Sequence, residues 1–85
     1  MSSLTIKICG ITSFMDAQMA TSFGATHLGF ILYEKSPRYI DRYQAGEILG
    51  RVQPATVSSV AVMVNPDPSF LNEVKSCGFD FFQIH

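Results

Sequence analysis

Four short segments rich in apolar, β-branched and aromatic residues alternate along the chain with three segments of helical pattern. The apolar segments comprise residues 4–9, 27–33, 58–64 and 80–84. Each has the length of a strand, and the middle two are almost continuously apolar, which is typical of parallel strands buried on both faces. The strict alternation predicts an α/β fold of order β-α-β-α-β-α-β, with a parallel sheet and right-handed crossovers.

The helical segments carry residues at their ends that favour helix starts and stops. The residues suited to an N-cap or a first turn are Ser13 or Asp16, Asp41 and Pro68. The residues that would stop each helix are Gly24, Pro54 and Gly78. We therefore expect helices over residues 14–23, 41–52 and 68–77.

Composition limits the kinds of protein that this chain can be. Its 85 residues are 47% hydrophobic and 15% charged, with a formal net charge of -1, which fits one small packed domain over residues 1–85. The scattered basic residues exclude a nucleic-acid footprint, and no apolar run approaches the ~18 residues that span a bilayer. Two cysteines, Cys9 and Cys77, without a signal-peptide pattern predict a cytoplasmic protein with reduced thiols.

Two parallel architectures fit this order of elements, a doubly wound sheet and part of a (β/α)₈ barrel. The sequence reaches His85 at the end of the fourth strand, with no helix after it. A finished doubly wound domain usually covers both faces of its sheet, so we expect that part of the fold is missing, and the number of strands leaves the two architectures open. A flavodoxin-like phosphate-binding domain is a further alternative, although residues 9–12 offer a single glycine instead of a glycine-rich loop.

Polar residues concentrate where the expected strands end. Cys9 ends the first strand, Arg38 follows the second, Asn65 follows the third and His85 follows the fourth. The carboxyl ends of parallel strands share one edge, where the sites of both architectures form. The sequence therefore predicts a site with a thiol, a guanidinium and an imidazole at this edge, with Asn65 in a turn. His27 lies at the opposite edge and is expected to be structural.

Alternation along the first strand separates its side chains into two faces. Ile6 and Ile8 would pack under helices, which leaves Lys7 and Cys9 on the inner face. Residues two apart on one face are about 7 Å apart. A buried Lys7 cation at that range would favour the thiolate form of Cys9.

The same alternation in the fourth strand directs Phe82 and Ile84 toward the helices, and Gln83 and His85 inward. The methionines and phenylalanines are expected to lie in the core. Cys77 is expected to be a packing residue at the end of the third helix.

Residues 7–12, Lys-Ile-Cys-Gly-Ile-Thr, resemble the first-strand signature of the phosphoribosylanthranilate isomerase family. Residues 24–30, 36–39, 62–65 and 83–85 resemble, in the same order, its second strand, the loop after it, its third strand and its fourth strand. The resemblance covers essentially the whole chain. It identifies the chain as the N-terminal half of a member of this family.

The resemblance implies a (β/α)₈ barrel of about 200 residues or more that acts in tryptophan biosynthesis. It implies an Amadori rearrangement of N-(5′-phosphoribosyl)anthranilate, with no cofactor and no metal. Cys9 would be the general base that removes the C2 proton, and Arg38 would hold the anthranilate carboxylate. Lys7 and His85 are further candidates for substrate binding.

The family's general acid and phosphate site belong to segments beyond the fourth strand, and neither Asp67 nor Asp80 matches the position of that acid. We therefore expect the chain alone to have little activity and to pair with a missing C-terminal half. An alternative is a half-barrel that acts as an assembly or interaction module without catalysis. Open first and fourth strands and an uncovered inner face predict self-association in either case.

Overall fold

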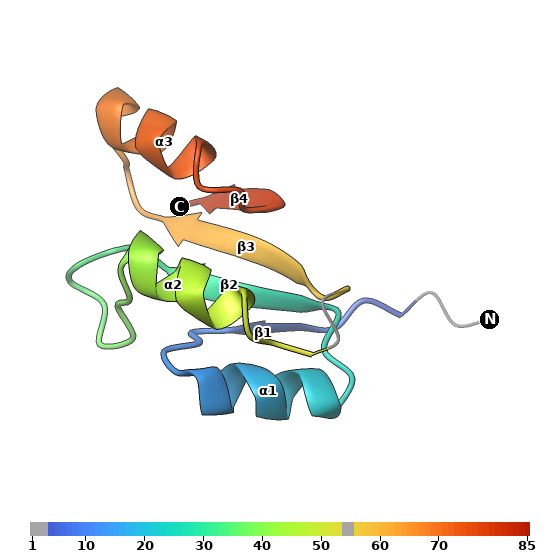
Figure 1. Ribbon diagram of the computed structural model, residues 1–85. Helices are drawn as coiled ribbons and strands as arrows, with labels where there is room; N and C mark the ends of the chain where they lie inside the picture. The colour runs from blue at the N-terminus through green and yellow to red at the C-terminus, as the bar shows by residue number, and fades with distance from the viewer. Residues whose placement is uncertain (1–3, 54–55) are drawn as a thin grey trace.

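The computed structural model describes residues 4–53 and 56–85. Its elements follow in the order β1 (Lys7–Cys9), α1 (Phe14–Ser22), β2 (His27–Ile31), α2 (Arg42–Leu49), β3 (Ser58–Met63), α3 (Pro68–Lys75) and β4 (Phe81–Ile84). The predicted alternation is confirmed, because the four strands are parallel and lie in sequence order across one sheet (Figure 1). Pro54, the expected helix stop, and residues 1–3, where no signal-peptide pattern is expected, lie outside the described residues.

The strands are shorter than the apolar segments that predict them. The register of β1 with β2 begins at the pair Lys7–His27, so the strand starts three residues later than residue 4. β2 ends at Ile31, and the chain then leaves the sheet for the loop that carries Arg38. An apolar pattern marks residues that can be buried, whereas a strand also needs a hydrogen-bonding neighbour at each position.

The helix starts follow from side-chain caps. The Ser13 hydroxyl accepts a hydrogen bond from the Asp16 N–H at 3.1 Å, so Ser13 is the N-cap and Asp16 lies in the first turn. Asp41 and Gln44 form a reciprocal capping box at α2, and Asp67 caps α3. The helices have nine, eight and eight residues. No helix in the described part of the chain is long and apolar enough to cross a membrane.

The hydrophobic core lies between the helices and one face of the sheet. Leu28 and Phe30 of β2 and Met63 of β3 point into it and are almost completely buried. The helices contribute smaller side chains, such as Ala17 of α1 and Val74 of α3. Because strands in sequence order are joined by right-handed crossovers, the three helices lie around the same outer side of the curved sheet (Figure 1).

Polar contacts also tie the outer layer together. The Gln18 amide of α1 donates to the Gln53 carbonyl at 2.7 Å and accepts from the Gln53 N–H at 3.1 Å, which fastens the segment after α2 to α1. Arg42 of α2 donates to Glu73 of α3 at 2.6 Å. The hydrogen bond that Arg42 donates to Glu73 raises the pKa of Arg42 above its ordinary value, so this guanidinium stays charged.

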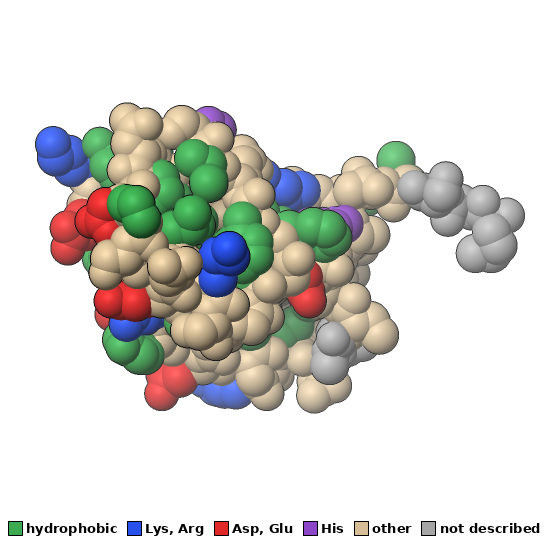
Figure 2. All heavy atoms as spheres, turned by 90° about the horizontal axis from the view of Figure 1, so that it is seen from above, with side chains coloured by type: hydrophobic (Ala, Val, Ile, Leu, Met, Phe, Trp, Pro, Cys, Tyr) green, Lys and Arg blue, Asp and Glu red, His purple; other side chains and the backbone are tan. Residues whose placement is uncertain are grey.

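The sheet has open edges, and the expectation that the methionines and phenylalanines are core residues is right for Phe30, Met63 and Phe79 and wrong for the exposed ones. Within residues 4–53 and 56–85, β1 pairs only with β2, and β4 pairs only with β3. Phe82 and Ile84, expected to pack under helices, are 39% and 54% exposed because α3 covers only one side of β4. Figure 2 shows hydrophobic side chains at the surface on the side of α3 and β4. The other exposed ones include Met15, Met19, Phe23 and Phe81.

Cys77 is also not a packing residue. It follows α3, its side chain is exposed, and its Sγ lies 3.3 Å from the Glu73 carbonyl oxygen. The expectation was wrong because a place near a helix end does not say which side of the last turn faces the sheet. Val74 takes that side and is fully buried.

Candidate active site

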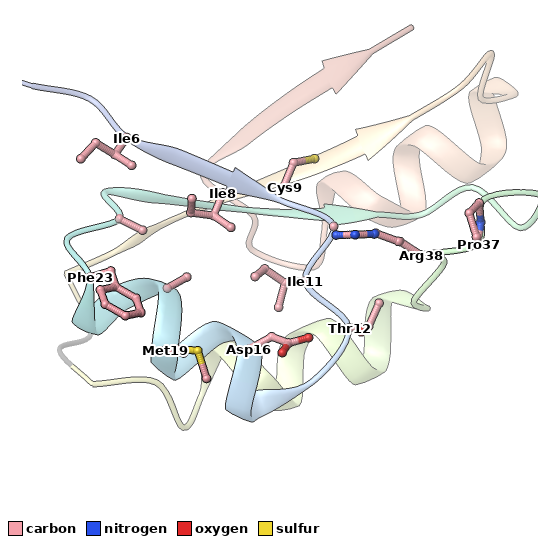
Figure 3. A pocket seen from close by; sticks show the side chains of 13 residues that line it. Ile6, Ile8, Cys9, Ile11, Thr12, Asp16, Met19, Phe23, Pro37 and Arg38 are labelled. Atoms are coloured by element: carbon pink, nitrogen blue, oxygen red, sulfur yellow. The ribbon is translucent and has the colours of Figure 1, made fainter.

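Cys9 is the last residue of β1 and lies at the carboxyl edge of the sheet with its side chain exposed. Figure 3 shows its thiol on the opposite face of β1 from Ile8, which points toward α1, as strand alternation predicts. The chain turns immediately after it at Gly10, whose φ is 84°. The N–H groups of Gly10 and Ile11 both donate to the Gly29 carbonyl of β2, at 3.0 and 3.1 Å, and this fixes the turn.

Arg38 lies in a loop that its own hydrogen bonds hold against the end of β2. The Ser36 hydroxyl accepts from the Arg38 N–H at 3.1 Å, and the Ser36 carbonyl accepts from the Tyr39 N–H at 3.1 Å. The Ser36 N–H donates to the Tyr33 carbonyl at 3.0 Å. Tyr39 then forms a bridge with Ile31, which returns the chain to the edge of the sheet. The loop therefore brings the guanidinium to the strand ends.

The Arg38 side chain lies over the turn that follows Cys9. A Cβ atom placed on Gly10 would be 2.7 Å from the Arg38 Cδ and 3.1 Å from its Nη1, so glycine leaves the space that the arginine occupies. Cys9 and Arg38 both line a cavity of about 520 Å³. Most of this cavity runs along the outer side of β1 against α1 (Figure 3), so the reactive groups lie at its end. Thr12 and Asp16 also line it, and sequence reasoning had given neither residue a place there.

Lys7, Gln83 and His85 meet on the inner face. The Lys7 ammonium donates to the Gln83 amide oxygen, and the Gln83 amide nitrogen lies 2.9 Å from the His85 Nε2. Side chains from the first and fourth strands therefore contact each other across the concave sheet, with Gln83 and His85 inward as predicted. Lys7 is exposed, because no helix among the described residues covers this face, and its burial against a second half of a barrel stays a prediction.

His27 and Asn65 have the structural positions that the sequence predicts. His27 Nδ1 lies 2.8 Å from the Thr26 hydroxyl, and its ring packs against Phe81 with 5.3 Å between centroids, at the amino-terminal end of the strands. Asn65 follows β3 with a φ of 42°, a turn conformation that asparagine tolerates. Among the residues that the structure describes, no group of three or more His, Cys, Asp or Glu side chains could hold a metal ion.

A curved parallel sheet with sequential strands, helices on its outer side and polar groups at its carboxyl edge is the architecture of half a TIM-barrel enzyme. The sequence model of the N-(5′-phosphoribosyl)anthranilate (PRA) isomerase family matches residues 6–85. The chain belongs to this family.

Curated relatives and solved structures agree with this assignment. The chain is 46% identical over 81 residues to the N-(5′-phosphoribosyl)anthranilate isomerase of Citrifermentans bemidjiense and 41% identical over 80 residues to that of Aquifex aeolicus. Each match covers 94% of this chain and 39% of the relative, so the chain spans about two fifths of their length.

The crystal structure of phosphoribosyl anthranilate isomerase from Thermotoga maritima has a TM-score of 0.88 and 37% identity, covering 96% of this chain and 40% of that one. A phosphoribosyl anthranilate isomerase structure in complex with reduced 1-(o-carboxyphenylamino)-1-deoxyribulose 5-phosphate has a TM-score of 0.88 and 37% identity. That match covers 96% of this chain and 42% of that one. The expected half-barrel is therefore confirmed at the level of the fold.

Proposed function

We propose that this chain supplies the N-terminal half of a barrel that converts N-(5′-phosphoribosyl)anthranilate into 1-(o-carboxyphenylamino)-1-deoxyribulose 5-phosphate. The observation that carries the proposal is that Cys9 and Arg38, which come from separate segments, lie on either side of the turn at Gly10, at the carboxyl edge of the sheet. A related structure that holds the reduced product supports the choice of substrate. The protein acts in the cytoplasm, in tryptophan biosynthesis, where the thiol stays reduced.

In this reaction a general acid opens the ribose ring to give a C1–nitrogen imine, and Cys9 then takes the proton from C2. The electrons of the C2–H bond form a C1–C2 double bond while the π electrons of the protonated imine move onto the nitrogen, and the resulting enolamine takes a proton at C1 as the C2 hydroxyl loses one, which gives the C2 ketone. The Arg38 guanidinium pairs with the anthranilate carboxylate, because its planar donors match the two oxygens. Lys7 and His85 bind substrate from the inner face, where both carry donors.

The general acid and the phosphate site come from a C-terminal half that pairs with this chain. The chain spans 39% of the length of its relative, which leaves room for both groups in the remainder. A general acid or base contributes about 10²–10⁴-fold to the rate. The chain alone therefore has little activity, and the open edges of β1 and β4 are where the second half adds its strands.

The test is reconstitution with the remaining residues of the Citrifermentans bemidjiense relative, added as a separate chain or as a fusion. We expect conversion of N-(5′-phosphoribosyl)anthranilate, followed by its fluorescence, only when both halves are present. Cys9→Ala should lower kcat by at least about 10²-fold. Cys77→Ala is the matched control, because this exposed thiol lies away from the cavity, and it should keep full activity. Full turnover by Cys9→Ala would end the assignment of the base.

A second function, assembly without catalysis, is favoured by the exposed apolar edges. Ile8 on one edge strand is 41% exposed, and Ile84 on the other is 54% exposed. Exposed strand edges with apolar side chains pair with other chains. Light scattering after size-exclusion chromatography should therefore show a dimer of this chain at high micromolar concentration. Addition of a C-terminal half should convert this dimer into a one-to-one complex of the two halves. A monomer at that concentration would contradict self-association.

A further inference from the structure

Gly29 of β2 lies directly beside Cys9 in the sheet. The two residues are partners in the parallel register, so a side chain at either position points to the same inner face. Gly29 is buried, and its φ is not among the positive values that favour glycine. Glycine weakens the interior of a strand, and here the backbone conformation does not require it. The reason for glycine must therefore be the space that a side chain would fill.

That space is occupied by the cysteine. A Cβ atom built on Gly29 would lie 2.9 Å from the Cys9 Sγ, 3.2 Å from its Cα and 3.3 Å from its Cβ. The sulfur could rotate away from an added methyl group, but the Cα belongs to the backbone of β1 and could move only with the strand. The missing side chain at Gly29 thus determines both where the thiol lies and how closely β1 approaches β2.

The backbone of Gly29 links the thiol to the guanidinium. Its carbonyl accepts the two hydrogen bonds that fix the turn after Cys9, from Gly10 at 3.0 Å and Ile11 at 3.1 Å. Arg38 lies over that turn, against Gly10. A displacement of β1 away from β2 would therefore shift the thiol and the surface that supports Arg38 together.

We propose that Gly29 is a positioning residue for Cys9. Because it has no side chain, Gly29 lets the Cys9 thiol lie over β2, at the distance from Arg38 that the reaction requires. Gly29 does not touch the substrate, and it acts through the position of β1 and of the sulfur. The catalytic part of this inference rests on the proposed isomerase function. Its structural part, the position and reactivity of the thiol, does not.

The first test measures the alkylation rate of the Cys9 thiol in the 85-residue chain. In a Cys77→Ser background, Gly29→Ala should slow alkylation of Cys9 by iodoacetamide several-fold, because the new methyl group takes the space beside the sulfur. Gly46→Ala is the matched control, since a Cβ at this exposed position of α2 meets no atom within 4 Å. An alkylation rate equal to that of the parent chain would overturn the inference, whatever the isomerase assay gives.

The second test uses the barrel reconstituted with the C-terminal half. A displacement of about 1 Å can cost about 10²-fold in rate, so Gly29→Ala should lower kcat by about that factor. KM should change less than kcat, because the substrate contacts of the other half are unchanged while the support of Arg38 shifts with β1. If Gly29→Ala only destabilised the barrel, the fraction of folded, active protein would fall instead, and kcat per folded active site would be unchanged. If the parent barrel has no activity, the proposed function fails, and the alkylation result still decides the role of Gly29.

A third variant covers the case in which Gly29→Ala does not fold. Cys9→Gly removes both the Sγ and the Cβ that the new methyl group would meet. The contact with the Cys9 Cα at 3.2 Å remains, but the double variant Cys9→Gly, Gly29→Ala should be more stable than Gly29→Ala alone, as judged by circular dichroism and urea denaturation. A double variant as unstable as the single one would show that the cost of a side chain at Gly29 does not come from Cys9, and would overturn the inference.

Discussion

The start of β4 is attached to β3 by one carboxylate, and its removal should be measurable as a loss of stability. The Asp80 Oδ2 accepts from the Ser59 N–H at 2.9 Å and from the Ser59 hydroxyl at 3.2 Å, and the Asp80 N–H donates to the Ser59 Oγ at 3.0 Å. Ser59 is only 3% exposed. Asp80→Ala removes the acceptor of two hydrogen bonds and leaves the donors of Ser59 with little access to water.

The magnitude follows from these contacts. A hydrogen bond to a charged group contributes about 1.5–3 kcal/mol, and the bond from the Ser59 N–H is the shorter of the two. Asp80 itself is exposed, so water offsets part of the loss, and we expect Asp80→Ala to cost about 2 kcal/mol in free energy of unfolding. A chain of this size has roughly 4–13 kcal/mol of stability in total. A cost of that size lowers Tm by roughly 8–16 °C.

Urea denaturation followed by circular dichroism measures this cost directly. Asp80→Asn keeps an oxygen acceptor without the charge and should lose about half as much. Glu47→Ala removes an exposed carboxylate from α2 and should stay within about 0.5 kcal/mol of the parent chain. If Asp80→Ala is as stable as Glu47→Ala, the contact with Ser59 does not hold the start of β4.

Two further changes test the helix starts and the core. Asp41→Ala removes the capping box of α2 and should cost about 1 kcal/mol in free energy of unfolding by urea denaturation, whereas Asp41→Ser should recover most of it. Phe30→Ala should cost about 3–5 kcal/mol, because Phe30 is fully buried, while Phe82→Ala, at a position 39% exposed, should cost clearly less in the same assay. Equal costs for the two phenylalanines would contradict the burial of Phe30 in the core and the partial exposure of Phe82 at the edge strand.

Local patterns are sufficient to predict the order of elements and the faces of the strands. Each apolar segment or helical pattern is set by about ten consecutive residues. The caps at Ser13 and Asp41 are set by a residue only three positions further along the chain. Strand alternation likewise placed Cys9 on the inner face and Gln83 with it, and the structure has both there. These features were predictable because each depends on neighbours in the sequence.

The errors arose where burial depends on distant or additional segments. Lys7 lies on the inner face and is exposed in the described chain, and its expected burial needs a second half of a barrel to cover that face. Phe82 and Ile84 face the helix side, yet a strand at the edge of a sheet receives a helix on one side only. The sequence pattern gives the direction of a side chain, and the rest of a barrel would decide how much water reaches it.

The environment of Cys9 is the part of the site that depends most on long-range structure. Its motif identified the residue, and its strand position identified the edge, but its nearest neighbours come from residues about 20 and 30 positions away. Gly29 lies beside Cys9 only because of the register between β1 and β2. The alternation of side chains does not fix this register, because moving one strand by two residues keeps the same side chains on the same face. Arg38 is beside Gly10 only because the loop after β2 folds back through Ser36 and Tyr39. The sequence motif is therefore sufficient to identify the Cys9 thiol, whereas the proposed role of Gly29 in positioning that thiol can be inferred only from the register of the sheet.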